Sequence, residues 1–131
     1  MKKNIFTRIL AIAIVAMSIM AIAIPAMADS GTIDAIPHKK VKGDSITFSS
    51  GSTVTFSVSC TLNSGDVVRV FLDSWDPGRN KWVERRTVKF QTAGYRSSTL
   101  SYTLKATECK VRLRTYGYED NSGTLTVSYS Y

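Results

Sequence analysis

Apolar and polar residues alternate along most of the chain, and nothing after residue 28 repeats with the 3.6-residue period of a helix. The alternating runs are short, rich in Val, Thr, Ser, Phe and Tyr, and separated by Gly, Asn, Asp or Pro. They predict seven strands, at residues 45–48, 52–60, 66–72, 82–90, 96–104, 109–116 and 124–129. Short strands with frequent turns are typical of a small antiparallel β-sandwich or jelly roll, so we expect an all-β fold of that kind.

The same alternation assigns an inner face to most strands, because successive side chains of a strand point to opposite sides of its sheet. The predicted inner faces are Val54, Phe56, Val58 and Cys60; Val68, Val70 and Leu72; Leu100, Tyr102 and Leu104; Cys109, Val111 and Leu113; and Leu125, Val127 and Tyr129. The strand at 82–90 is the exception. If Trp82 and Phe90 point inward, Glu84 does too, and the opposite phase buries Arg85. A β-bulge near residues 84–86 would resolve this conflict.

The first 28 residues have the three-part pattern of a secretory signal peptide. A basic start is followed by an uncharged stretch at residues 9–24 and by Ala-Met-Ala at 26–28. We expect cleavage after Ala28 and a secreted, extracellular protein without stable membrane insertion; a retained membrane anchor is the alternative. Residues 29–43 are polar and are expected to form an irregular leader that ends in an edge strand, before a single sandwich domain at 44–131.

Two cysteines in an exported chain predict one disulfide, Cys60–Cys109, since both residues fall on the apolar phase of their strands. Such a bridge would stabilise a domain of 103 residues, which buries only about two-thirds of its unfolded surface. Two buried free thiols are the alternative.

The charge balance changes when the signal peptide is removed. The full chain has a net charge of +7, and residues 29–131 have +4. This mildly basic balance favours anionic surfaces but is too small to indicate nucleic acid.

The sequence gives little indication of a catalytic or metal site. His38 is the only histidine, and it lies in a charged, polar segment, so no Ser-His-Asp arrangement is expected. Zinc ligation lacks enough His and free Cys, and no loop has the spacing of a calcium site. We therefore expect no catalytic residue, no metal and no cofactor.

A row of basic residues is the first candidate for binding. If Val111 and Leu113 point inward, then Lys110, Arg112, Arg114 and Tyr116 point outward along one strand. Cations spaced about 7 Å apart could follow an anionic polymer. The alternative is a solvated face whose charges resist edge-to-edge aggregation.

The segment Trp75-Asp76-Pro77-Gly78-Arg79-Asn80-Lys81-Trp82 is the second candidate. Asp-Pro-Gly-Arg suits a type II turn, with Gly78 at positive φ. Strand parity places Trp75 on the exposed side, so that Trp75, Arg79 and Lys81 could contact a ligand, while Trp82 is assigned to packing. The alternative is a cross-strand aromatic pair worth about 1 kcal/mol. If the turn and the basic row lie on the same side of the molecule, they form one patch.

Residues 109–118, Cys-Lys-Val-Arg-Leu-Arg-Thr-Tyr-Gly-Tyr, followed by Ser-Gly-Thr-Leu-Thr-Val at 122–127, resemble the closing hairpin of bacterial pre-peptidase-type jelly-roll domains. Gly65-Asp66 before a strand is similar to an earlier part of that pattern. The resemblance implies a small secreted β-sandwich.

These features favour a secreted module that binds rather than catalyses, with an extracellular or cell-wall polymer, either anionic or a glycan, as its partner. One alternative is a secreted antagonist, such as a bacteriocin-like toxin or an enzyme inhibitor that inserts a loop. Another is a structural protein of an extracellular matrix, which would self-assemble.

Overall fold

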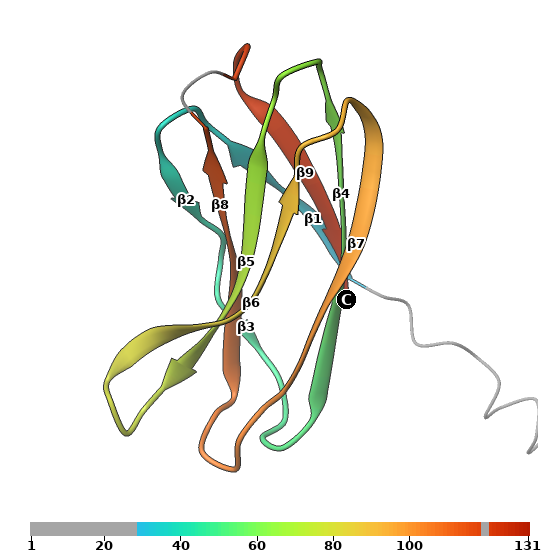
Figure 1. Cartoon of the computed structure of the whole chain (residues 1–131). Helices are drawn as coiled ribbons and strands as arrows, with labels where there is room; N and C mark the ends of the chain where they lie inside the picture. The colour runs from blue at the N-terminus through green and yellow to red at the C-terminus, as the bar shows by residue number, and fades with distance from the viewer. Residues whose placement is uncertain (1–28, 119–120) are drawn as a thin grey trace, which may run out of the picture.

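The computed structural model describes residues 29–118 and 121–131, which form two antiparallel β-sheets packed face to face (Figure 1). The predicted signal peptide at 1–28 lies outside the described residues. Sheet A has the strand order β1-β9-β4-β7, and sheet B has the order β2-β8-β5-β6, with β3 also paired to β8. The strands are β1 (Ser30–Ala35), β2 (Lys40–Lys42), β3 (Ile46–Thr47), β4 (Thr53–Leu62), β5 (Val68–Asp76), β6 (Lys81–Phe90), β7 (Gly94–Thr103), β8 (Lys110–Gly117) and β9 (Leu125–Ser130).

The all-β sandwich expected from the sequence is confirmed, but the described residues contain nine strands rather than seven. Each of the seven predicted runs corresponds to one of β3 to β9. The two additional strands lie in the segment 29–43, for which the sequence predicts an irregular leader that ends in an edge strand. β2 is that edge strand, whereas β1 is not expected from the sequence. β1 pairs along its whole length with β9, and β2 pairs with β8 at the edge of sheet B. The sandwich therefore includes this segment. Its polar composition obscures the alternation of inward and outward side chains in the sequence.

The core lies between the two sheets and contains the apolar faces that strand parity predicts. Phe56, Val70, Val111 and Val127 are fully buried at its centre. Tyr102 and Tyr129 are half-buried and pack against its margin. Burial of one face of β4, β8 and β9 fixes their register, because a slip of one residue would turn the apolar set outward.

The predicted disulfide is wrong, because Cys60 and Cys109 are both free thiols. The backbone oxygen of Cys109 accepts a hydrogen bond from Phe48 N, which places Cys109 at the end of the sandwich where β4 begins. Cys60 lies seven residues beyond Thr53 along β4, which corresponds to about 23 Å at 3.3 Å per residue. A disulfide needs Cα atoms within about 7 Å. Cys60 is buried on the core side of β4, whereas Cys109 is half-buried just before β8, at the opposite end of the sandwich.

The β-bulge predicted near residues 84–86 is confirmed. Leu72 pairs with Arg86 and Asp73 pairs with Glu84, so Arg85 has no partner in the ladder between β5 and β6. The extra residue changes the phase of β6, and Arg85 turns toward the other sheet. Its guanidinium donates to Ser74 Oγ at 2.9 Å and to the buried carboxylate of Glu108.

This Arg85 contact belongs to an inter-sheet network, which we define as Ser74, Arg85, Tyr102 and Glu108. Tyr102 of sheet A donates to Glu108 Oε2 at 2.8 Å, and Lys105 N donates to the same oxygen at 3.0 Å. Burial opposes ionisation of Glu108, but the Lys105 amide, the Tyr102 hydroxyl and Arg85 outweigh it and lower the pKa of Glu108. The network therefore joins the sheets through an ionised, fully buried carboxylate.

A second buried carboxylate, Asp66, ties two loops together at the opposite end of the sandwich. Its oxygens accept hydrogen bonds from Asn63 N at 3.0 Å and from Ser122 N at 2.9 Å. The Ser122 amide is the largest cause of a lowered pKa for Asp66, and it prevails over the opposing effect of burial. Asp66 thus stabilises both the β4–β5 loop and the start of the β9 segment.

Candidate functional site

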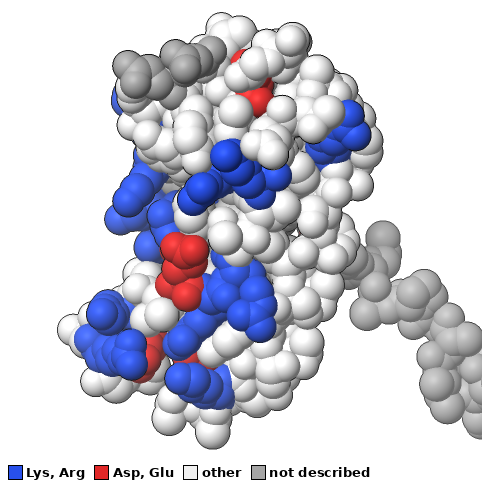
Figure 2. Space-filling view, in the orientation of Figure 1, with Lys and Arg blue, Asp and Glu red and all other residues white. Residues whose placement is uncertain are grey.

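The outward side chains of sheet B form a charged surface, which we call the basic face. It comprises Lys40, Lys42, Arg69, Phe71, Asp73, Trp75, Trp82, Glu84, Lys89, Lys110, Arg112, Arg114 and Tyr116. Figure 2 shows Lys and Arg side chains gathered over β2, β8, β5 and β6, around a small acidic spot. Antiparallel pairing brings strands that are distant in the sequence into one surface, so the basic face draws on four segments of the chain.

Asp73 lies at the centre of the basic face and holds two arginines. Its Oδ2 accepts hydrogen bonds from Arg112 Nε at 3.2 Å and from Arg114 Nε at 3.1 Å. The Asp73 side chain is only 2% exposed, while those of Arg112 and Arg114 are 14% and 13% exposed. Arg114 also lies 3.7 Å from the carboxylate of Glu84. One buried carboxylate therefore fixes the direction of two guanidinium groups.

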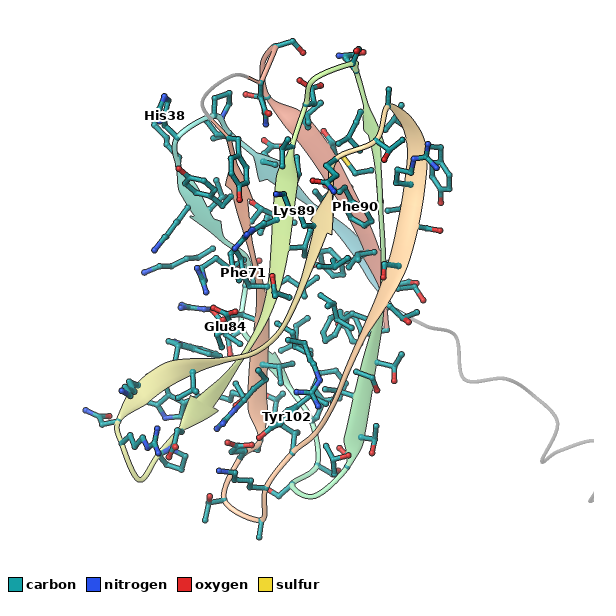
Figure 3. The ribbon with its side chains drawn as sticks, in the orientation of Figure 1. His38, Phe71, Glu84, Lys89, Phe90 and Tyr102 are labelled. Atoms are coloured by element: carbon teal, nitrogen blue, oxygen red, sulfur yellow. The ribbon has the colours of Figure 1, made fainter. Side chains whose placement is uncertain are left out.

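Both arginines also lie over aromatic rings, one on the adjacent strand β5 and one on β6 beyond it. The Arg112 guanidinium carbon is 4.4 Å from the centre of the Trp82 ring, and that of Arg114 is 4.1 Å from the centre of Phe71. Trp82 in turn meets Trp75 edge to face, with ring centres 5.6 Å apart. Cation–π contacts of this kind hold the guanidinium groups close to the sheet. In Figure 3, Phe71 and Glu84 lie one after the other along the front of sheet B.

A depression of about 330 Å³ opens among these groups. Its lining residues are Lys40, Lys42, Asp73, Trp82, Glu84, Arg112 and Arg114. They combine ammonium and guanidinium donors, carboxylate acceptors and one aromatic surface. The volume is in the range of small-ligand sites, and ion pairs hold Asp73, Arg112 and Arg114 in place before any ligand arrives.

The structure brings some of the sequence-predicted residues into this depression and leaves others outside. Arg112 and Arg114 line it, whereas Lys110 and Tyr116 lie on the same strand beyond its two ends. Trp75 is half-buried against Trp82. The Trp75–Trp82 pair and the row on β8 do lie on one side of the molecule, since Arg112 contacts Trp82 directly.

Arg79 and Lys81 lie apart, at the tip of the β5–β6 hairpin, and the turn there is not type II. Asn80, not Gly78, has positive φ, at 54°. Asp76 Oδ1 accepts hydrogen bonds from the amides of Gly78 and Arg79, at 3.0 and 3.2 Å. This Asx-turn pattern satisfies the backbone without a left-handed Gly78. The predicted turn type is therefore wrong.

Sequence reasoning missed four residues of the depression. Lys40 and Lys42 fell in the presumed leader, although Lys-Val-Lys is a short alternating pattern. Asp73 is not among the candidates that the sequence singles out, and Glu84 enters there only through the phase conflict of its strand. Trp82, assigned to packing, packs on Trp75 and also lines the depression.

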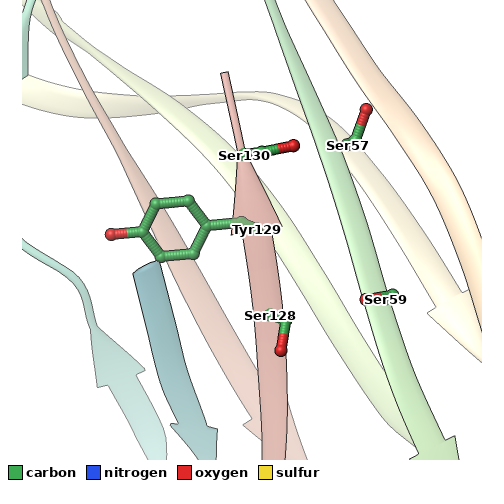
Figure 4. A pocket seen from close by; sticks show the side chains of 5 residues that line it. All are labelled: Ser57, Ser59, Ser128, Tyr129 and Ser130. Carbon is green, nitrogen blue, oxygen red and sulfur yellow. The ribbon is translucent and has the colours of Figure 1, made fainter. Parts of the chain in front are cut away.

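The outward side of sheet A has the opposite character, and we call it the hydroxyl face. On β4 it carries Thr53, Thr55, Ser57, Ser59 and Thr61, whose partners on β7 are Thr103, Ser101, Thr99, Ser97 and Tyr95. Cross-strand pairs bond to each other, as Thr53 does with Thr103 at 2.8 Å. Figure 4 shows Ser57 and Ser59 beside Ser128 and Ser130 around a shallow pocket of about 190 Å³.

Within the described residues, no group of three or more His, Cys, Asp or Glu side chains could hold a metal ion. The same residues contain no helix long and apolar enough to span a membrane.

The sequence matches no protein-family model, and no curated protein is similar enough to count as a relative. Among solved structures, the chain is similar to a family 16 carbohydrate-binding module, with a TM-score of 0.52, 9% identity, and 75% of this chain and 71% of that chain covered. It is also similar to PirA, with a TM-score of 0.50, 13% identity, and 82% and 98% of the two chains covered. At such low identity these likenesses show a shared β-sandwich fold and nothing further.

Proposed function

We propose that the protein is a secreted, non-catalytic β-sandwich that binds polysaccharide through the depression on the basic face. Secretion rests on the signal-peptide pattern of residues 1–28. The strand order, in which β1-β9-β4-β7 faces β2-β8-β5-β6, favours the jelly-roll form of the sandwich.

The main support for this proposal is the set of side chains that line the depression. A sugar ring offers hydroxyl groups that donate and accept hydrogen bonds, and C–H surfaces that are apolar. Lys42 and Arg112 supply donors, Glu84 supplies an acceptor, and Trp82 supplies an aromatic wall. Because Asp73 and the rings hold Arg112 and Arg114 in one direction, little side-chain entropy is lost when a ligand binds.

Two further observations support a binding role. The fold is one that a carbohydrate-binding module also has, which makes sheet-face binding compatible with this architecture. The depression is open and contains no histidine or nucleophilic hydroxyl beside a base, within the residues that the structure describes.

Affinity electrophoresis of the purified protein through gels that contain soluble polysaccharides tests the proposal. We expect retardation by at least one polysaccharide, and a decrease in affinity of about tenfold or more for Trp82→Ala. Lys42→Gln, at an exposed position, should weaken binding with the fold intact. Lys105→Gln removes an exposed charge outside the depression and is the matched control. Retardation by no polysaccharide, or equal affinities for the wild type and Lys42→Gln, would contradict the proposal.

The β5–β6 hairpin favours a second candidate, an antagonist that inserts its tip into a partner protein. The last pair between β5 and β8 is Ser74 with Val111, so Trp75 to Lys81 extends beyond the neighbouring strand (Figure 1). The Arg79 side chain at the tip is 65% exposed. Inhibition or killing that is lost in Arg79→Ala, while retardation by polysaccharides is unchanged, would favour this candidate.

A further inference from the structure

The basic face ends in a row of side chains that crosses sheet B from edge to edge. Lys40 pairs with Tyr116, Tyr116 pairs with Arg69, and Arg69 pairs with Lys89. We call these four residues the end row. Neighbouring strands are about 4.8 Å apart, so Lys40 and Lys89 stand about 14 Å apart across three strand spacings.

The cations of the end row differ from the arginines that Asp73 holds. Arg112 and Arg114 share a carboxylate, whereas Lys40, Arg69 and Lys89 make no ion pair with any described residue. The positive charge of the end row is therefore not neutralised by the described part of the chain.

Arg69 and Lys89 also converge on one aromatic ring. The Arg69 guanidinium carbon lies 5.9 Å from the centre of the Tyr118 ring, and Lys89 Nζ lies 5.5 Å from it. Tyr118 meets Tyr116 edge to face at 5.4 Å. The Tyr118 ring attracts both cations, so two like charges are held near each other with no carboxylate of a described residue paired to either.

One donor of this pair has no acceptor among the described residues. Arg69 Nε is buried and makes no hydrogen bond with any of them. Leaving a buried donor unsatisfied is unfavourable, and so is the repulsion between neighbouring cations. A carboxylate bound beside Arg69 and Lys89 would relieve both.

We propose that the polysaccharide is acidic, and that its uronate carboxylates bind to the end row while a neighbouring sugar occupies the depression. This inference rests on the proposed function and adds the substrate class. Lys42 pairs with Arg114 in the row next to Lys40 and Tyr116, so the end row and the depression are contiguous. A single acidic chain can therefore contact both.

Other polyanions fit the basic face less well. A membrane surface would need exposed apolar side chains, but the exposed large hydrophobic among the described residues is Tyr95, at 68%, on sheet A. Nucleic acid would bring a densely charged phosphate backbone against the basic face, where Asp73 and Glu84 would repel it.

The experiment compares polygalacturonate with the same polymer after its carboxylates have been reduced to alcohols. At about 0.1 M salt, we expect the wild type to bind the acidic polymer about tenfold or more tightly than the reduced one, and the difference to shrink near 1 M salt. The variant Arg69→Gln/Lys89→Gln should lose most of that difference. Arg79→Gln/Lys105→Gln removes two exposed cations away from the end row and is the matched control. Lys89→Glu reverses one exposed charge and tests the same prediction if the Arg69 variant is unstable.

The outcomes separate the two proposals. Equal affinity for the acidic and reduced polymers overturns the acidic ligand and leaves polysaccharide binding intact. Binding to no polysaccharide overturns both. If the end-row variant and the control variant lose the preference for the acidic polymer to the same extent, only net charge matters and the end row is not a site. The same conclusion follows if the wild type binds duplex DNA and vesicles of anionic phospholipid as tightly as it binds polygalacturonate.

Discussion

Asp73 shows how much of the basic face depends on a single residue. Its carboxylate directs Arg112 and Arg114, which are 39 and 41 positions away in the sequence. The sequence alone showed only an acid before a Pro-Gly turn, for which backbone hydrogen bonding is the ordinary role. Because the partners become neighbours only when β5 pairs with β8, no local pattern could have identified this role.

We expect Asp73→Asn to lower the free energy of unfolding by about 2 kcal/mol, because two guanidinium groups would lose their shared counter-charge. The loss should be smaller than for a fully buried pair, since both arginines keep some contact with water. Urea denaturation measures it. Asp34→Asn, at an exposed position on β1, is the control and should change the free energy by less than about 0.5 kcal/mol.

At the scale of elements, the strands were easier to predict than their ends. In each strand that buries one face, alternating apolar residues indicate which side chains point inward. The bulge at Arg85 could be predicted because either phase of that strand would turn a charged residue toward the core. β1 was missed because it lies at the edge of sheet A and carries few apolar residues, whereas β2 is the edge strand expected at the end of the leader. The turn after Asp76 was misread because Pro-Gly satisfies more than one turn geometry, and Asx hydrogen bonds decided between them.

The turn also yields a prediction. Asn80 has φ of 54°, which costs most residues about 1 kcal/mol or more but suits Asn. Asn80→Ala should therefore destabilise the protein by about 1 kcal/mol. Gly78→Ala should have a smaller effect, since Gly78 does not need positive φ, although a new Cβ would lie 3.3 Å from Asp76 Oδ1. Thermal unfolding of both variants measures the difference. A larger destabilisation by Gly78→Ala than by Asn80→Ala would contradict this assignment and favour a type II turn.

At the scale of the whole molecule, Asp66 and Glu108 connect elements at opposite ends of the sandwich. Both have lowered pKa values in the folded state. As the pH falls, the unfolded chain takes up protons at these groups first, so equilibrium moves toward unfolding. Their contribution is complete above the ordinary carboxyl pKa of about 4 and is lost as the pH falls through the lower, folded values.

Stability should therefore decrease below about pH 4. Urea denaturation across the acid range measures the slope. Glu108→Gln should start with a lower free energy of unfolding near neutral pH, because Arg85 loses its partner, and should show a shallower acid dependence. An acid dependence as steep as that of the wild type would contradict this assignment. Asp44→Asn, at an exposed position before β3, is the matched control.

The positions of the two cysteines bear on how the chain reaches its native state. Since Cys60 and Cys109 lie at opposite ends of the sandwich, the sheets are joined by packing, hydrogen bonds and ion pairs alone. Formation of the sandwich therefore does not depend on a bond between these two thiols.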